Sequence, residues 1–153
     1  MAIAMKQKIT LKARAIRYLS IREYSVRELA RKLSSYASDE DDLDALMEWL
    51  QARGFLSESR FVDAYVRRQS VRYGNARILR DLQNHGVSDS VLHDTESEML
   101  DNEFERAWHV WRKKFGHKPS DIREQARQIR FLQQRGFSGE IIRQVMKSDA
   151  LPD

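Results

Sequence analysis

Arginine is the residue type that this sequence offers most clearly for binding chemistry. Lys and Arg together number 27 among 153 residues, and 19 of the 27 are Arg. The planar guanidinium can donate paired hydrogen bonds to one phosphate or carboxylate, whereas the Lys ammonium acts as a compact point charge. The composition therefore predicts directed contacts with the anionic groups of a partner.

The charges alternate in blocks along the chain. The net charge is +7 over residues 1–34, −6 over 35–59, +5 over 60–80, −8 over 81–105 and +6 over 106–153, which gives +4 for the whole chain. Acidic blocks repel phosphate wherever they share its face. We therefore expect any anion-binding surface to be a patch or a stripe, and most other charges to lie on solvated helix faces.

The residues that usually carry catalysis or bind metals are missing or badly spaced. The chain has no Cys, and its four His residues form no helical metal-binding pair. The six Gly residues do not form a phosphate-binding loop, and no Ser stands in a G-x-S-x-G turn. The acidic run Asp39–Asp42 fits a solvated helix start better than a calcium loop. We expect a binding protein with no enzymatic activity, metal or cofactor.

Composition also indicates the class of protein and its compartment. Hydrophobic residues make up 41% of the chain and charged residues 33%, so there is enough apolar material for a packed fold. No stretch approaches the roughly 20 apolar residues of a transmembrane helix. Residues 1–10 lack the apolar centre of a secretory signal. We expect a cytoplasmic protein without membrane contacts.

Three segments share one pattern, namely Leu-Gln, two further residues, Gly and an apolar residue, at 50–55, 82–87 and 132–137. A Gly after the last apolar residue of a helix can adopt the left-handed conformation that closes a Schellman motif or an αL cap. Ser88 and Ser138 then follow as predicted N-caps of the next helices. The pattern predicts three equivalent helix ends.

A second register supports a repeat of about 50 residues. A capping box begins at Ser25, and similar helix starts follow at Asn75 and Ser120. No window alternates as a strand would, so we expect an all-α fold of stacked units. The predicted repeats are 9–54, 55–98 and 99–148, each with three helices. The nine predicted helices are 9–21, 26–36, 40–53, 58–71, 75–85, 89–98, 101–115, 120–135 and 139–147.

Two apolar stripes identify candidate core residues. One stripe combines Leu43, Leu46, Met47 and Leu50, and a longer one combines Phe104, Ala107, Trp108, Trp111 and Phe115. Their spacing is that of one buried helix face. The aromatic rings could instead stack on unpaired nucleic acid bases, but core packing is the more frequent role of aromatic residues at this spacing.

Four motifs stand in order along the chain: Ser-Val-Arg-Glu-Leu-Ala-Arg-Lys-Leu at 25–33, Ser-Arg-Phe-Val-Asp-Ala-Tyr-Val-Arg at 59–67, the segment from Tyr73 to Val87, and Ile-Arg-Phe-Leu-Gln-Gln-Arg-Gly-Phe-Ser at 129–138. Together they resemble the RecX family, the bacterial regulators of the RecA recombinase. The resemblance extends over about residues 11–147. The departures are local, with Ser57-Glu-Ser59 in place of an acidic pair and His85 where Lys or Arg is usual.

The resemblance implies three tandem three-helix repeats in an elongated, curved molecule. It implies binding along the RecA filament on DNA, with lower ATP hydrolysis and strand exchange because filament growth is limited or its subunits are loosened. Such a protein would act in DNA repair by homologous recombination and in the SOS response, as a monomer without cofactor.

The candidate contact surface for RecA or DNA is a set of eight arginines. On predicted helices 58–71 and 120–135 they alternate with the apolar stripes Phe61, Tyr65 and Ile122, Ala126, Ile129, so we expect them to point outward. The set is Arg67, Arg68, Arg72, Arg77, Arg80, Arg127, Arg130 and Arg135.

Two other functions remain open at this point. Helix 75–85 carries Arg77 and Arg80 near its start, which fits the recognition helix of a DNA-binding protein that acts without RecA. The acid-rich stretch from Asp81 to Glu105 argues against this alternative. A helical scaffold for some other protein is the second alternative. Weak, salt-sensitive, nonspecific binding of single- or double-stranded DNA is compatible with either a RecA regulator or a DNA-binding protein.

Overall fold

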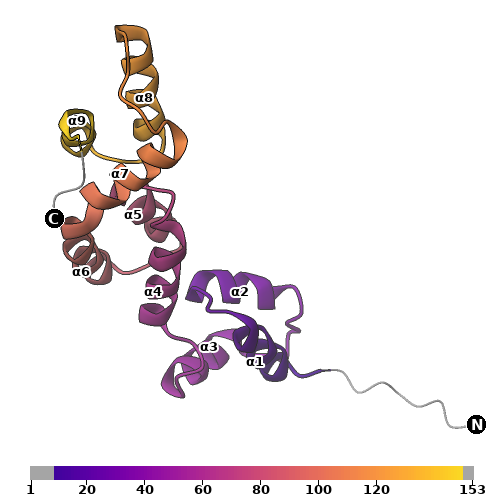
Figure 1. Cartoon of the computed structure of the whole chain (residues 1–153). Helices are drawn as coiled ribbons and strands as arrows, with labels where there is room; N and C mark the ends of the chain where they lie inside the picture. The colour runs from indigo at the N-terminus through magenta and orange to yellow at the C-terminus, as the bar shows by residue number, and fades with distance from the viewer. Residues whose placement is uncertain (1–8, 150–153) are drawn as a thin grey trace, which may run out of the picture. The chain divides into compact units, whose positions relative to one another are not determined.

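The computed structural model describes residues 9–149, which form helices and turns and no strand (Figure 1). The all-α prediction is confirmed. The chain divides into two compact units, Met1–Phe61 and Val62–Asp153. The helices of the first are α1 (Leu11–Ile21), α2 (Val26–Ser34) and α3 (Leu43–Ala52), and α4 (Glu58–Gln69) begins in it. The second unit contains the rest of α4, then α5 (Asn75–Asn84), α6 (Asp89–Met99), the 3-10 turn η1 (Leu100–Asn102), α7 (Glu103–Lys114), α8 (Ile122–Gln134) and α9 (Gly139–Lys147).

The three predicted helix ends are confirmed, and each of them is a Schellman motif. Gly54, Gly86 and Gly136 have φ values of 78°, 82° and 90°. In each case the N–H of the residue after Gly donates to the carbonyl of the Leu that opens the segment, over 2.9 Å in the first copy and 3.2 Å in the other two. These Leu side chains are fully buried. One local motif thus closes α3, α5 and α8.

The predicted helix starts are only partly equivalent. Ser25 and Ser138 cap α2 and α9 by accepting from backbone N–H groups, and Ser88 stands at the N-cap of α6. Ser120 does not cap α8, because Asp121 takes that position and accepts from the Glu124 N–H. The helices of the second unit therefore begin in different ways.

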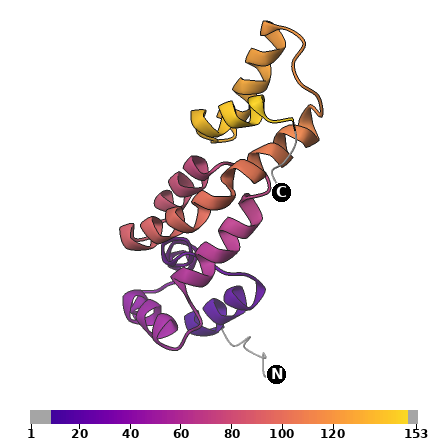
Figure 2. The same ribbon diagram turned by 60° about the vertical axis from the view of Figure 1, so that its left-hand side comes forward.

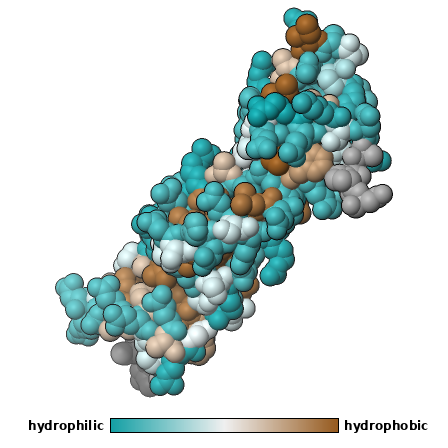
Figure 3. Space-filling view, turned by 90° about the vertical axis from the view of Figure 1, so that its left-hand side faces the viewer, coloured by the Kyte–Doolittle hydropathy of each residue, from teal (hydrophilic) through white to brown (hydrophobic). Residues whose placement is uncertain are grey.

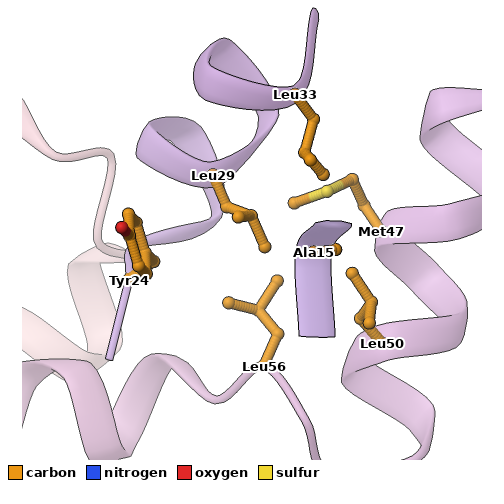
Figure 4. Packing of buried hydrophobic residues seen from close by; sticks show 7 residues of the cluster. All are labelled: Ala15, Tyr24, Leu29, Leu33, Met47, Leu50 and Leu56. Atoms are coloured by element: carbon orange, nitrogen blue, oxygen red, sulfur yellow. The ribbon is translucent and has the colours of Figure 1, made fainter. Parts of the chain in front are cut away.

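The first unit has a core made by its three helices (Figure 4). Ala15 from α1 and Leu29 from α2 point toward Leu50 from α3, and Leu56 closes the cluster from the loop after α3. Burying one Leu side chain contributes about 2 kcal/mol to folding. Of the predicted stripe, Met47 and Leu50 lie in this core, while Leu43 and Leu46 pack at its edge.

In the second unit α7 supplies the central packing helix, with α8 and α9 folded against it (Figure 2). Trp108 and Trp111 are buried, with 5% and 4% of their surface exposed, and they pack with Leu132 of α8 and Val145 of α9. Core packing is confirmed for these two rings, which leaves neither face open to a nucleic acid base. Phe104 and Phe115 pack at the edge of the same core.

The buried face of α8 differs from the predicted one. Ile122 is 84% exposed and Ala126 is exposed, whereas Gln128 is fully buried. The Trp111 indole N–H donates to Gln128 Oε1 over 2.8 Å, and Gln128 Nε2 donates to the His117 carbonyl over 3.2 Å. A buried amide with partners for both of its ends costs little, so a polar side chain occupies the core position. On α4, Phe61 and Tyr65 are buried as predicted.

The start of α5 lies against the turn between α8 and α9 at two glycines. The Gly74 N–H donates to the Arg135 carbonyl over 2.7 Å. A Cβ atom at Gly74 would stand 2.4 Å from the carbonyl carbon and oxygen of Gly136. Only a residue without a side chain allows the two backbones to approach this closely.

Replacing Gly74 is therefore expected to separate these elements. Gly74→Ala should lower the free energy of unfolding by about 3 kcal/mol, because the added methyl meets backbone atoms that cannot rotate away. Gly139→Ala is the matched control, since its Cβ would meet only a flexible Arg143 nitrogen at 3.6 Å. Urea unfolding followed by circular dichroism measures both, and equal stabilities of the two variants would contradict the close approach.

Candidate partner-binding groove

The eight predicted arginines all lie in the second unit. Arg77 and Arg135 are half-buried, and the other six are exposed: Arg67, Arg68, Arg72, Arg80, Arg127 and Arg130. The prediction that these side chains point outward fits the six exposed arginines and fits Arg77 and Arg135 only in part, and the fold does not place all eight in one patch.

Tyr73 brings two of these arginines together from distant parts of the sequence. The guanidinium carbon of Arg77 lies 3.8 Å from the centroid of the Tyr73 ring, and that of Arg135 lies 5.5 Å from it. Arg135 also lies 5.0 Å from the centroid of Phe131. Cation–π contacts of this kind hold the guanidinium groups in place without neutralising their charge.

A groove runs along the end of α7, one face of α8 and the turn after α4. It consists of two depressions that share Lys114 and Phe131, and we call it the basic groove. Its cationic lining residues are Arg72, Lys113, Lys114, Arg127, Arg130 and Arg135, and none of its lining residues is acidic. Such a surface attracts anionic partners.

Two phenylalanines form the apolar floor of the basic groove. The rings of Phe115 and Phe131 meet edge to face, with centroids 5.4 Å apart and planes at 85°. Lys114 and Arg135 lie over Phe131, and Arg127 lies 5.8 Å from the centroid of Phe115. Cations thus lie beside both rings, each of which is half-buried.

Four of the predicted arginines do not line the basic groove: Arg67, Arg68, Arg77 and Arg80. Arg80 lines a separate depression between α5 and α6, where Asp89 and Glu96 also contribute to the lining. Arg68 lies 5.6 Å from the centroid of Tyr65, and neither Arg67 nor Arg68 lines the groove. Conversely, sequence reasoning missed Lys113, Lys114 and Phe131. The paired lysines after the Trp stripe of α7 were the available signal.

Arg106, which was not predicted, fixes the turn that carries Arg72 into the groove. Its side chain donates to the carbonyl of Ser70 over 3.1 Å and to that of Tyr73 over 2.6 Å. A third bond of 2.5 Å reaches the side-chain oxygen of Asn75. One guanidinium therefore holds three points of the turn between α4 and α5.

A buried carboxylate completes this network. Glu103 is only 6% exposed and accepts from the Asn75 N–H over 2.8 Å, while the Asn75 amide donates to the Met99 carbonyl over 3.0 Å. Burial lowers the pKa of Arg106, and the negative charge of Glu103 opposes that lowering. Glu103 belongs to the acidic block 81–105, so the expectation of a solvated charge is wrong for this residue.

The loop before α8 positions Phe115 at the other end of the groove. His117 bonds with the Phe115 carbonyl over 2.8 Å and with Glu124 Oε1 over 2.9 Å. Glu124 also accepts from the backbone N–H and the hydroxyl of Ser120, and these bonds lower its pKa. Lys118 donates to the carbonyls of Val145 and Met146 at the end of α9.

Residues 9–149 contain neither a metal-binding cluster nor a membrane-spanning helix. No cluster of three or more His, Asp or Glu residues in this range could hold a metal ion. Within the same range no helix is long and apolar enough to span a bilayer. The surface in Figure 3 is mostly hydrophilic, with small separate hydrophobic areas.

Comparisons with known proteins identify relatives over most of the chain. Residues 101–146 match the family model described as RecX, third three-helix domain. A regulatory protein RecX from Herbaspirillum seropedicae is 48% identical over 140 residues, which cover 92% of this chain and 91% of the relative. One from Herminiimonas arsenicoxydans is 46% identical over 143 residues, covering 94% of this chain and 95% of the relative.

Solved structures show the same fold. The crystal structure of RecX from Lactobacillus salivarius matches with a TM-score of 0.75 at 21% identity, covering 90% of this chain and 92% of the other. A second crystal structure, of a regulatory protein RecX, matches with a TM-score of 0.74 at 18% identity, covering 90% of this chain and 74% of the other.

The Arg106 network yields a stability prediction. Arg106→Ala removes the cation beside buried Glu103 and leaves the Ser70 and Tyr73 carbonyls without their donor. We expect a loss of about 3 kcal/mol in the free energy of unfolding. Arg112→Ala is the control, because Arg112 is exposed and makes one contact with Trp108 at 5.1 Å, worth about 0.5–1 kcal/mol. If urea unfolding shows the same small loss in the free energy of unfolding for both variants, the network adds no stability.

Proposed function

Because the chain belongs to the RecX family of regulatory proteins, we propose that it binds the RecA recombinase and its filament on DNA and inhibits filament growth, ATP hydrolysis and strand exchange. RecA is the partner that the RecX resemblance implies. The observation that supports the proposal in the structure is the basic groove, which has six cations and no acid in its lining.

The charge distribution of the second unit suits a filament with acidic subunit surfaces and basic DNA-binding elements. The basic groove would meet the acidic surfaces. The exposed acids of α6, among them Asp94, Glu96 and Glu98, would meet the basic elements. Complementary charges of this kind accelerate encounter and fix orientation, and their effect weakens as salt rises.

The remaining expectations belong to the same proposal. The protein would act as a monomer in the cytoplasm, by binding alone, without catalysis or a cofactor. The repeats 9–54, 55–98 and 99–148 would follow each other along the filament. The eight predicted arginines would contribute unequally, with Arg72, Arg127, Arg130 and Arg135 in the groove making the main contacts.

Direct DNA binding by α5 is less well supported. A recognition helix must present its first turn to a DNA groove. Here Gly74 and Asn75 at the start of α5 are buried, since Gly74 lies on Gly136 and the Asn75 N–H is held by Glu103, and only Ala76 of the first turn is exposed. Arg77 is stacked on Tyr73, and Arg80 lies in a depression shared with two acids. Weak, nonspecific DNA binding by exposed arginines remains compatible with RecA regulation.

The primary test is RecA ATP hydrolysis on single-stranded DNA during titration with this protein. Binding of the protein to the same DNA without RecA is measured in parallel. We expect inhibition well below one protein per RecA, at concentrations where little bare DNA is bound. Inhibition that begins only when the DNA is saturated would favour competition for DNA and contradict filament regulation.

Charge reversals in the groove should weaken inhibition. Arg127→Glu with Arg130→Glu places two acids in the lining, and we expect the concentration for half-inhibition to rise at least about tenfold. The double change Arg68→Glu with Arg72→Glu is expected to act in the same direction, through Arg72.

The control for these variants is Arg143→Glu with Lys147→Glu, which makes the same charge change at exposed positions of α9. Circular dichroism verifies the fold of each variant. Unchanged inhibition by the groove variants at matched salt would remove the groove from the proposed interface.

A further inference from the structure

The basic groove is more than a patch of positive charge, because its cations are arranged around an apolar centre. Arg127 and Arg130 lie in one depression, and Arg72 and Arg135 lie in the other. Phe131 and Lys114 belong to both depressions, and Val71, at 71% exposure, adds an apolar side chain to the second. A ligand that matches the groove therefore carries anionic groups for the arginines on both sides and an apolar group for Phe131 and Val71.

The aromatic rings of the groove are not arranged for unpaired bases. Proteins that bind single strands usually stack bases on open aromatic faces. Here Phe115 and Phe131 pack edge to face on each other, and both rings are half-buried. Arg127, Lys114 and Arg135 lie over the rings. The rings thus offer an apolar floor between cations, and not a stacking platform.

We propose that the basic groove binds an acidic segment of a protein partner, in which carboxylates flank an apolar side chain. The carboxylates would pair with Arg127 and Arg130 at one end and with Arg72 and Arg135 at the other, since guanidinium groups bind carboxylates through two parallel hydrogen bonds. The apolar side chain would contact Phe131 and Val71. For the identity of the partner this inference rests on the proposed RecA regulation.

The two parts of the groove have different effects on binding. Exposed cations at the rim set the encounter rate and the orientation of the ligand, and salt screens their contribution. The apolar centre supplies affinity that salt does not screen, as aromatic and aliphatic anchors do at the centres of protein interfaces. Nucleic acid bound through its phosphates would instead lose nearly all its affinity as salt rises.

The test uses the whole chain and two fluorescent peptides of equal length and charge. Both have acidic residues at each end, and the middle is Leu-Phe in one peptide and Ala-Ala in the other. We expect the Leu-Phe peptide to bind about tenfold more tightly in fluorescence anisotropy, and to keep this advantage at high salt. An oligothymidylate of the same charge is expected to bind more weakly than the Leu-Phe peptide and with a steeper salt dependence.

Two substitutions separate the charged and apolar contributions. Arg130→Glu should weaken both peptides about tenfold. Val71→Ser changes an exposed side chain, so the fold is preserved, and it should reduce only the advantage of the Leu-Phe peptide. Arg143→Glu on α9 is the control for charge and should leave peptide binding unchanged.

Three results would overturn the inference. Equal binding of the two peptides would show that charge alone acts. Tighter binding of the oligothymidylate than of the Leu-Phe peptide would identify a nucleic acid groove, if Arg130→Glu abolishes that binding. Binding unaffected by Arg130→Glu would place the ligand elsewhere.

RecA inhibition is measured in parallel to keep the two proposals apart. Groove-dependent binding of the Leu-Phe peptide without RecA inhibition would overturn the proposed function and support the ligand chemistry of the groove. Relief of RecA inhibition by the Leu-Phe peptide, but not by the Ala-Ala peptide, would support both.

Discussion

The close approach of Gly74 to Gly136 is the contact on which the binding surface depends. It brings the turn after α4 against the end of α8, where the Gly74 N–H bonds to the Arg135 carbonyl. The same contact sets Tyr73 beside Arg135, and the turn also carries Arg72. Segments about 60 residues apart share one groove because the two glycines, which have no side chains, allow their backbones to approach each other.

Helix boundaries were well predicted because their causes are local. The Leu-Gln-x-x-Gly pattern contains the whole Schellman motif, and Ser25 and Ser138 cap the residues that follow them directly. The buried face of α8 was not predictable in this way. Gln128 is buried because Trp111 and His117, which are distant in sequence, bond to its amide. A reading by hydrophobicity alone places Ile122 inside and Gln128 outside.

The candidate site shows the same division. The arginine-rich helices could be identified by counting, and the resemblance to RecX supplied the family. The packing of α7 against α8 could not be predicted by counting, and this packing adds Lys113 and Lys114 to the groove. Counting also gives every Arg the same role, whereas Arg106 uses its donors on internal carbonyls and Arg130 presents its charge to solvent.

The bond between Trp111 and Gln128 also constrains how this core can change in evolution. Replacing Trp111 by Phe alone would leave the buried amide oxygen of Gln128 without its donor, and replacing Gln128 by Leu alone would do the same to the indole N–H. Replacing both together removes the polar pair and leaves an apolar core. In homologous proteins the two positions are thus expected to vary as a pair, so that the contact can be recognised by covariation where neither residue is retained.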